Sequence, residues 1–166
     1  DVGAADEVAT GAERQDAEIM RAVNFATRKG VVCVASVGNE GKDMLVFPAA
    51  HGNVIGVAST TEEDKRAPFS NFGPDMVWVA APGEGVITTF PGSSYAAAWG
   101  TSFSTAFVSG AVALLLEVDI KTNAAQAGDA LSHAKSISEE LGYGRLDLYE
   151  AVLARRPRPT QVLWVL

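Results

Sequence analysis

The chain of 166 residues is long enough for one compact domain with a sizeable core, and its 48% hydrophobic and 20% charged residues exclude a wholly disordered protein. A net charge of −7 without a basic stripe argues against a nucleic-acid partner. No stretch reaches the roughly 18 apolar residues of a membrane span, so we predict no membrane span.

The first part of the chain leads into a helix. Residues 1–14 are small, polar and rich in Gly and Ala, which predicts a loop. Residues 15–29 carry apolar side chains at helical spacing, and Gly30 then supplies a C-terminal stop signal. Because the chain begins with Asp1 and shows no signal peptide, we expect the natural N-terminus, with any targeting signal, to lie upstream.

Three short apolar runs predict buried strands, at residues 31–37, 54–60 and 76–80. The single cysteine, Cys33, lies in the first run, where we expect it to act as a small buried hydrophobe. A helix that leads into a buried strand, with further buried strands after it, indicates a parallel sheet covered on both faces. The predicted fold class is therefore α/β, with three αβα layers around a mostly parallel sheet.

The second half alternates loops with helices. Residues 61–75 are charged and turn-rich, which predicts a surface loop, and residues 86–98 combine a short strand with a turn. Residues 102–117 are small or apolar almost all round, which is typical of a buried helix. Gly110 in its middle costs about 1 kcal/mol against Ala, so we expect close packing against a neighbour there. The last predicted elements are an amphipathic helix over 124–135, a turn at 142–144 and a short helix capped by Asp147.

One segment carries the residues of a nucleophilic site. Ser102 follows Gly100 and Thr101 and opens the predicted buried helix. A serine acts as a nucleophile when its hydroxyl is held rigidly near a base, and a helix N-terminus offers unpaired N–H groups to developing negative charge. Ser102 could equally be a simple helix N-cap. The esterase elbow G-x-S-x-G is excluded because Ser104 stands at its fifth position.

A second segment, Gly38-Asn39-Glu40-Gly41, directly follows a predicted buried strand. The side-chain amide of Asn39 carries two N–H donors, and such a donor can stabilise an oxyanion by roughly 3–4 kcal/mol in the transition state. Taken alone, the segment is equally typical of an asparagine in a Gly-rich turn.

The order of these segments among other short motifs resembles the subtilisin-like serine proteases, or subtilases. In chain order the motifs are Gly38-Asn39-Glu40-Gly41, Phe47-Pro48-Ala49, Val54-Ile55-Gly56-Val57-Ala58, Phe69-Ser70-Asn71-Phe72-Gly73-Pro74, Ala81-Pro82-Gly83, Gly100-Thr101-Ser102 and Gly142-Tyr143-Gly144-Arg145-Leu146-Asp147. The resemblance implies that residues 1–153 are the C-terminal part of a subtilase catalytic domain, with the fold incomplete because the N-terminal half is missing. Residues 154–166 would form a Pro/Arg-rich and apolar tail.

The resemblance implies a role for each site residue. Ser102 matches the nucleophile, and Asn39 matches the side-chain oxyanion donor, with the backbone N–H of Ser102 as its partner. The residues implied in binding the polypeptide substrate are Thr101 and those that match the pocket for the residue before the scissile bond, namely Ala35, Ser36, Val37, Gly38, Val46 and Phe47. The triad logic then implies peptide hydrolysis through an acyl-enzyme.

The chain departs from the family in lacking its triad Asp and His. Both precede the oxyanion asparagine in the family, but nothing before Asn39 resembles either motif. We expect His51 and His133 to be ordinary surface residues rather than replacements. The acidic run at 62–64 is interpreted as a solvated charge run, so no metal site is predicted. The structural calcium found in the family is not supported by this sequence, and no cofactor is predicted.

Two functions stay open at this point. The first is a serine endopeptidase, in which a complementary N-terminal half supplies Asp and His, and the retention of both Asn39 and Ser102 favours it. The alternative is a catalytically inactive subtilase-like module that binds a peptide or a partner. The resemblance implies a secreted or extracytoplasmic protein. Because a parallel sheet without about half its strands exposes an edge and an apolar face, we expect the chain alone to be marginally stable, to self-associate or to need a complementing segment.

Overall fold

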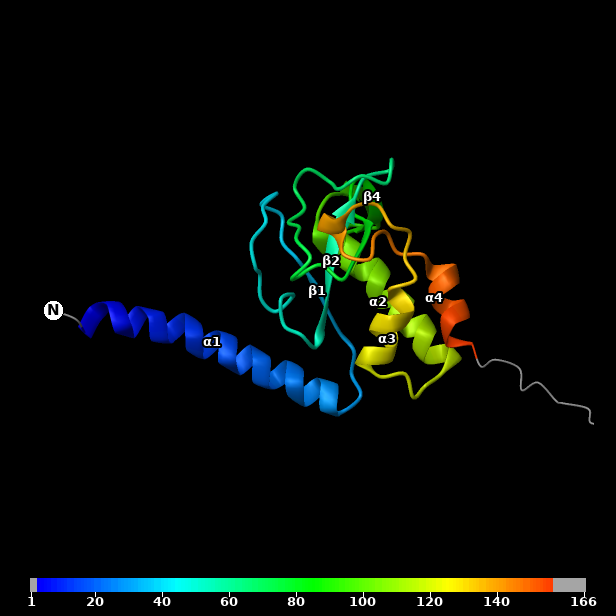
Figure 1. Ribbon diagram of the computed structural model, residues 1–166. Helices are drawn as coiled ribbons and strands as arrows, with labels where there is room; N and C mark the ends of the chain where they lie inside the picture. Colours follow the sequence, from blue (N-terminus) through cyan, green and yellow to red (C-terminus); the bar gives the residue numbers. More distant parts are fainter. Residues whose placement is uncertain (1–2, 157–166) are drawn as a thin grey trace, which may run out of the picture.

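A three-stranded parallel sheet forms the centre of the computed structural model, which describes residues 3–156 (Figure 1). Its strands are β1 (Cys33–Ser36), β2 (Val54–Thr60) and β3 (Val79–Pro82), in the order β1-β2-β3. Both pairs of neighbours are parallel, so the predicted parallel sheet is confirmed. The helices and this sheet form an incomplete three-layer α/β fold.

The central strand β2 separates two apolar clusters. Its side chains alternate between the faces of the sheet, because successive residues of a strand point in opposite directions. On one face, Ile55 and Val57 pack against helix α2 (Thr101–Val118). On the other face, Ala58 packs with Leu141 and with other residues from loops. Every residue of β2 is buried, as predicted for 54–60.

Three shorter helical segments follow α2: α3 (Ala124–Leu131), a 3-10 helix (Glu139–Leu141) and α4 (Leu148–Arg155). Side-chain caps begin two of them. Asn123 and Gln126 form a reciprocal capping box at the start of α3. The carboxylate of Asp147 accepts the N–H of Glu150 at the start of α4, which confirms the predicted cap. α4 packs against both α2 and α3.

The first helix, α1 (Gly3–Arg28), is longer than predicted. The loop expected over residues 1–14 is wrong from Gly3 onward, because the strong helix formers Ala, Glu and Arg outnumber the glycines there. The predicted stop is confirmed: Gly30 has a φ of +83°, and Val31 returns its N–H to the carbonyl of Ala26. In Figure 1, α1 points away from the body of the molecule.

Two predicted strand regions are corrected. Residues 86–98 hold two strands, β4 (Val86–Phe90) and β5 (Ser94–Ala98), which pair as an antiparallel hairpin across the predicted turn. The strand predicted over 76–80 begins only at Val79. The residues before it bend into the apolar cluster around Leu141, which takes them out of the strand.

Burial also differs from expectation in two places. The segment 61–75 is not a surface loop throughout, because Ala67, Ser70 and Asn71 are fully buried. Ala67 and Ser70 bond to Ser59 of β2, and Asn71 bonds to the loop that follows β1. Cys33 is half-buried rather than buried, since β1 lies at the edge of the sheet. The tail predicted from residue 154 begins within α4, and its residues 157–166 lie outside the described part of the chain.

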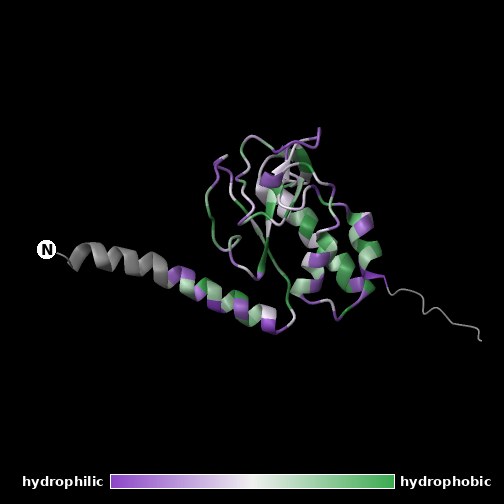
Figure 2. Cartoon of the chain, viewed as in Figure 1, coloured by the Kyte–Doolittle hydropathy of each residue, from purple (hydrophilic) through white to green (hydrophobic). Residues whose placement is uncertain are grey.

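Helix α2 is buried on one side only, although hydrophobic residues run along most of it in Figure 2. Phe107 and Leu114 are each 47% exposed, and an added Cβ at Gly110 would meet no atom within 4 Å. The expected all-round burial, and the close packing expected at Gly110, are therefore wrong. An apolar groove of about 480 Å³ follows this face and is called the α2 groove; its lining includes Val86, Ile87, Phe103, Phe107, Leu114 and Leu148.

By length and composition alone, α2 is apolar enough to cross a membrane, and among the described residues no other helix passes that test. Its side chains Val108, Ala111 and Leu115 pack into the core against the sheet. This packing is typical of the central helix of an α/β domain.

Candidate active site

The carboxyl ends of the strands bring two loops together at the start of α2. Ser36 ends β1 and leads into residues 37–42, while Gly83 follows the end of β3. The N–H of Gly100 donates to the carbonyl oxygen of Gly83 over 2.9 Å, which fixes the residue before α2. This edge is where open α/β sheets bind their ligands.

A tight turn presents Ser102 at the start of α2. Gly100 has a φ of +144°, in the left-handed region that favours glycine. Ser102 lies in the first turn of the helix with an exposed side chain, and N–H groups in a first turn have no intrahelical acceptor. Gly100 occupies the N-cap position, and no side chain caps the helix. The interpretation of Ser102 as a simple N-cap is therefore wrong.

Asn39 is held beside this turn by its side-chain oxygen. Oδ1 accepts the backbone N–H of Thr101 at 2.9 Å and the Thr101 hydroxyl at 3.1 Å. The Nδ2 group donates to no acceptor among the described residues, and the residue is exposed. Its two N–H bonds are thus free, beside the turn at Gly100 that precedes Ser102.

A pocket of about 400 Å³ opens next to Ser102. Its walls are Val34, Ala35, Ser36, Gly38, Val46, Phe47, Pro48, Ser102 and Thr105. Five of the predicted substrate-binding residues therefore line one pocket together with the predicted nucleophile. Ala35 and Val46 also pack against the apolar cluster around Leu141, which makes this side of the pocket apolar.

The other two predicted substrate-binding residues do not line this pocket. Val37 is fully buried, with its side chain in the cluster around Leu141. Thr101 is also fully buried, and its backbone N–H and hydroxyl bind Asn39. In this geometry Thr101 fixes the Asn39 side chain rather than lining the pocket.

Asn71 is a site residue that the sequence analysis did not identify. It lies in the motif 69–74, and its amide oxygen accepts the backbone N–H of Glu40 at 3.1 Å and that of Lys42 at 3.0 Å. Its amide nitrogen donates to the carbonyl oxygen of Val37 at 2.9 Å. The motif was a signal of family resemblance only, because residue types do not reveal a side chain that turns under a loop 31 residues earlier.

Neither histidine forms a hydrogen bond with Ser102 among the described residues. His51 lies half-buried against Phe47, with 4.7 Å between the ring centroids, and its buried Nε2 has no partner there. It is thus not the plain surface residue expected. His133 is exposed, and its Nδ1 lies 3.1 Å from the carbonyl oxygen of Asp129.

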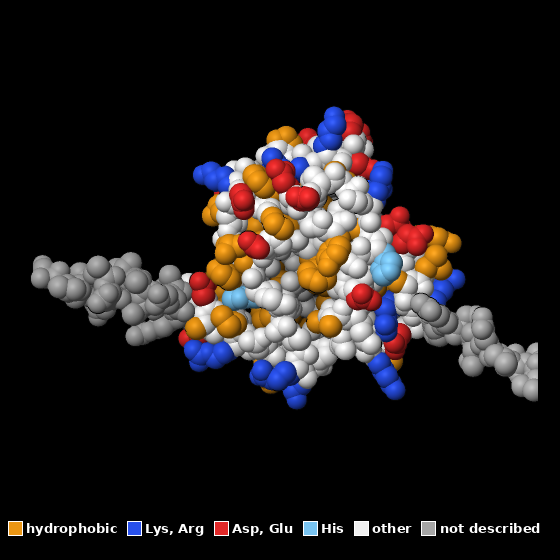
Figure 3. Space-filling model, in the orientation of Figure 1, with side chains coloured by type: hydrophobic (Ala, Val, Ile, Leu, Met, Phe, Trp, Pro, Cys, Tyr) orange, Lys and Arg blue, Asp and Glu red, His pale blue; other side chains and the backbone are white. Residues whose placement is uncertain are grey.

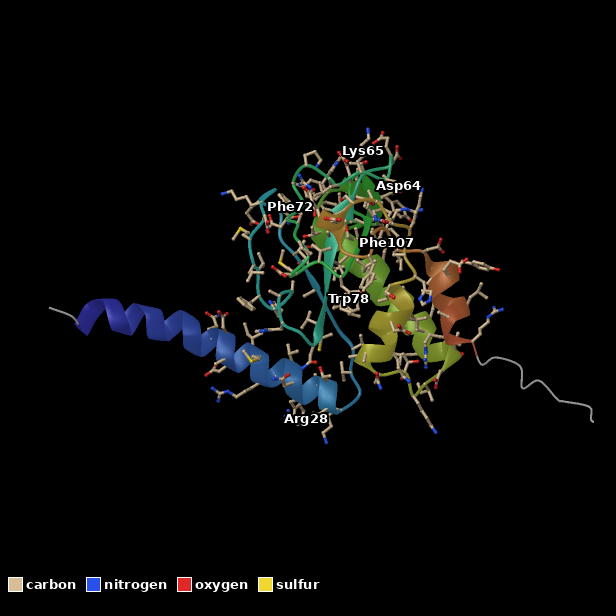
Figure 4. The ribbon with its side chains drawn as sticks, in the orientation of Figure 1. Arg28, Asp64, Lys65, Phe72, Trp78 and Phe107 are labelled. Atoms are coloured by element: carbon tan, nitrogen blue, oxygen red, sulfur yellow. The ribbon has the colours of Figure 1, made fainter. Side chains whose placement is uncertain are left out.

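The acidic run at 62–64 is only partly solvated. Asp64 binds Lys135 at 2.7 Å and Arg145 at 2.6 Å, and Figure 4 shows Asp64 at the far end of the body from Arg28. The hydrogen bond from Lys135, opposed by partial burial and helped by the charge of Arg145, lowers the pKa of Asp64. No group of three or more His, Cys, Asp or Glu side chains that could hold a metal ion occurs in the described part of the chain.

A helix-start serine beside a side-chain amide, at the carboxyl edge of a parallel sheet in an incomplete three-layer α/β fold, is typical of part of a subtilisin-like domain. The model of the subtilase family matches residues 3–146, so the chain belongs to the subtilase family.

The chain is similar to several characterised subtilases. It is 36% identical over 132 residues to Subtilisin BL of Lederbergia lenta, which covers 80% of this chain and 48% of that protein. It is 44% identical over 97 residues to Thermitase of Thermoactinomyces vulgaris, covering 58% of this chain and 34% of that protein. The chain thus spans about half the length of Subtilisin BL and about a third of the length of Thermitase.

Solved structures show the same likeness. A protease of Pseudoalteromonas arctica superposes with a TM-score of 0.77 at 29% identity, over 82% of this chain and 46% of that one. The self-cleaved protease domain of PatA superposes with a TM-score of 0.76 at 30% identity, over 82% of this chain and 54% of that one. Both support the incomplete subtilase fold.

Proposed function

We propose that this chain provides the nucleophile and the oxyanion hole of a serine endopeptidase, to which a complementary N-terminal half supplies Asp and His. The observation that carries the proposal is the 2.9 Å hydrogen bond from the N–H of Thr101 to Oδ1 of Asn39. It turns the Asn39 amide so that its N–H bonds are free to donate beside Ser102. Membership of the subtilase family supports serine endopeptidase chemistry in general.

In the proposed reaction, the Ser102 hydroxyl oxygen attacks the carbonyl carbon of the scissile peptide bond. The side chain of the residue before that bond occupies the pocket. Its proton passes to the histidine of the complementary half. The carbonyl oxygen, now negative, accepts N–H bonds from Asn39 and from the backbone of Ser102. The C–N bond breaks as the histidine returns the proton to the leaving amine, and water then hydrolyses the acyl-enzyme by the same proton route.

The α2 groove supports the need for a complementary half. Phe107 and Leu114 expose apolar surface on a helix that begins at the nucleophile, and Ile87 of β4 is 70% exposed across the groove. Apolar surface gathered in one groove of about 480 Å³ marks a site of association rather than scattered surface residues. A segment docked there would reach the vicinity of Ser102, where the missing base is needed.

The isolated chain would have little activity, because a triad nucleophile without its base loses most of its rate. We further propose an extracytoplasmic location for the whole protease, from its similarity to bacterial subtilisins.

A fluorophosphonate probe tests this proposal, with Ser102→Ala as control. The chain is treated alone and together with a subtilase N-terminal half that carries the Asp and His. We expect labelling only in the mixture, and none with Ser102→Ala in either arm. Labelling of the chain alone through Ser102 would mean that a local histidine acts as the base, and the need for a second half would be refuted.

One observation favours a second candidate function, a peptide-binding module without catalysis. Neither described histidine reaches Ser102 with a hydrogen bond, yet the pocket of about 400 Å³ is open. Absence of labelling in both arms, together with saturable binding of an uncleaved peptide that Ser102→Ala leaves unchanged, would establish this alternative.

A further inference from the structure

We propose that Asn71 and Glu40 form a brace that positions the oxyanion donor, so that Asn71 is a positioning residue of the reaction although it touches no reacting atom. The inference rests on the proposed function, because it adds a residue to the same site. The brace is the set of hydrogen bonds that join the Asn71 side chain to residues 37–42.

The Asn71 side chain uses both ends of its amide. Its Nδ2 donates to the Glu40 carboxylate over 2.7 Å and to the carbonyl oxygen of Val37 over 2.9 Å. Its Oδ1 accepts the N–H groups of Glu40 and Lys42. The side chain is fully buried and all its hydrogen-bonding capacity is used, so it holds one conformation. These contacts flank Asn39 on both sides along the chain.

Gly38 makes room for the brace. An ideal Cβ at Gly38 would lie 2.5 Å from Asn71 Nδ2 and 2.7 Å from Glu40 Oε2, which is closer than real Cβ contacts. Gly38 also has a φ of +98°. The Asn71–Glu40 pair therefore passes directly beside the Gly38 backbone, and this explains why glycine precedes the oxyanion donor.

Backbone hydrogen bonds align the same two segments. Asn71 donates its N–H to the carbonyl of Gly38 at 3.1 Å, and Gly41 donates to the carbonyl of Phe69 at 2.7 Å. These bonds do not depend on the residue at position 71. Replacing the Asn71 side chain should therefore loosen the Asn39 loop without detaching it.

A loosened Asn39 loop should slow the chemical step rather than weaken substrate binding. An oxyanion donor binds charge that exists only in the transition state, so its misplacement lowers kcat and leaves KM nearly unchanged. Complete removal of such a donor costs about 10²–10³ in kcat. We expect Asn71→Asp to lower kcat by about tenfold to a hundredfold, with KM changed by less than about threefold.

The kinetic test uses the protease assembled with its complementary half, with kcat expressed per site titrated to completion by the fluorophosphonate. Asn71→Asp keeps the acceptor for Glu40 and Lys42 but sets a carboxylate against the Glu40 carboxylate. Adding Glu40→Gln restores an amide–carboxylate pair with donor and acceptor exchanged. The double variant should therefore recover at least about a third of the kcat that Asn71→Asp loses. The matched control is Asn53→Asp, which makes the same substitution away from the site. Asn53 is exposed, lies just before β2 and bonds only to the Asn24 side chain among the described side chains.

A mutant cycle with Asn39 separates positioning from general stability. In an Asn39→Ala background no side-chain donor remains to be positioned, so Asn71→Asp should change kcat per titrated site by less than about twofold. Equal losses in both backgrounds would overturn the brace as a positioning device. Full activity of Asn71→Asp in the wild-type background would also overturn it, while leaving the proposed protease intact.

Amide hydrogen exchange gives a readout independent of catalysis. The brace predicts that the Glu40 and Lys42 amides are protected in the wild-type protein, and that Asn71→Ala makes them exchange at least about tenfold faster while residues of β2 keep their protection. If no Ser102-dependent activity is found in any assembly, the proposed function fails and this measurement still decides the brace. Unchanged exchange at Glu40 and Lys42 would refute it.

Discussion

The two sides of helix α2 contrast sharply. Toward the sheet, α2 buries Val108, Leu115 and their neighbours, and the loops at its start are fixed by side-chain hydrogen bonds from Asn39 and Asn71. Away from the sheet, Phe107 and the rest of the α2 groove lie open, and Figure 3 shows further apolar patches over the face of the body in view. The loop that holds the proposed oxyanion donor is thus fixed by hydrogen bonds, while α2, which begins at the proposed nucleophile, is packed on one side and open on the other.

On the side of α2 that is fixed by hydrogen bonds, we expect the largest loss of activity from replacing Asn39. We expect Asn39→Ala to lower kcat of the assembled protease by about 10²–10³, with little change in KM, a magnitude that comes from the related subtilisin. The turn before Ser102 should stay in place, because the hydrogen bond from the Gly100 N–H to the carbonyl of Gly83 does not involve Asn39. Steady-state kinetics per titrated site measure the effect, and an equal loss with Asn53→Ala would show that it is not specific to the site.

Adjacent leucines compare the two sides of α2 directly. Leu115 is fully buried and Leu114 is 47% exposed. In this chain alone, Leu115→Ala should lower the free energy of unfolding by about 3 kcal/mol, and Leu114→Ala by less than about 1 kcal/mol. Urea titrations measure both. Once the complementary half is added, the cost of Leu114→Ala should rise, and equal costs with and without that half would mean that nothing docks on this face.

A charge introduced at Phe107 tests whether the complementary half docks in the α2 groove. Phe107→Asp places a carboxylate in the α2 groove, and we expect it to weaken binding of the complementary half by about tenfold to a hundredfold, because burying an unpaired charge is costly. The matched control is Phe90→Asp, since Phe90 is 58% exposed on the hairpin and does not line the groove. Titration by calorimetry compares the two, and similar weakening by both variants would argue against docking in the groove.

The contrast also explains what the sequence could reveal. The strand at 54–60 and the cap at Asp147 are local patterns, and the structure confirms both. The ordered motifs predict roles for Ser102 and Asn39, which stay predictions. The contact of Asn71 with the Asn39 loop depends on two segments that meet only in the folded chain. The exposed face of α2 could not be predicted, because the apolar pattern of a helix is the same whether a given face is covered or open.

The smallest expected effect concerns Asp64, on the side of the body that is already fixed. Because Lys135 and Arg145 lower its pKa below the ordinary value of 3.8, the ionised carboxylate stabilises the fold above that value. This contribution is lost as the pH falls through the lowered pKa of the folded state.

In Asp64→Asn, the urea midpoint should therefore fall less steeply than in the wild-type chain between about pH 5 and pH 2. The difference should be small because Lys135, the main partner of Asp64, is 57% exposed and exposed ion pairs contribute little to stability. Glu63→Gln, an exposed neighbour, is the control and should leave the wild-type slope unchanged. Parallel curves for Asp64→Asn and the wild type would mean that the ion pairs with Lys135 and Arg145 do not contribute to the stability of this side.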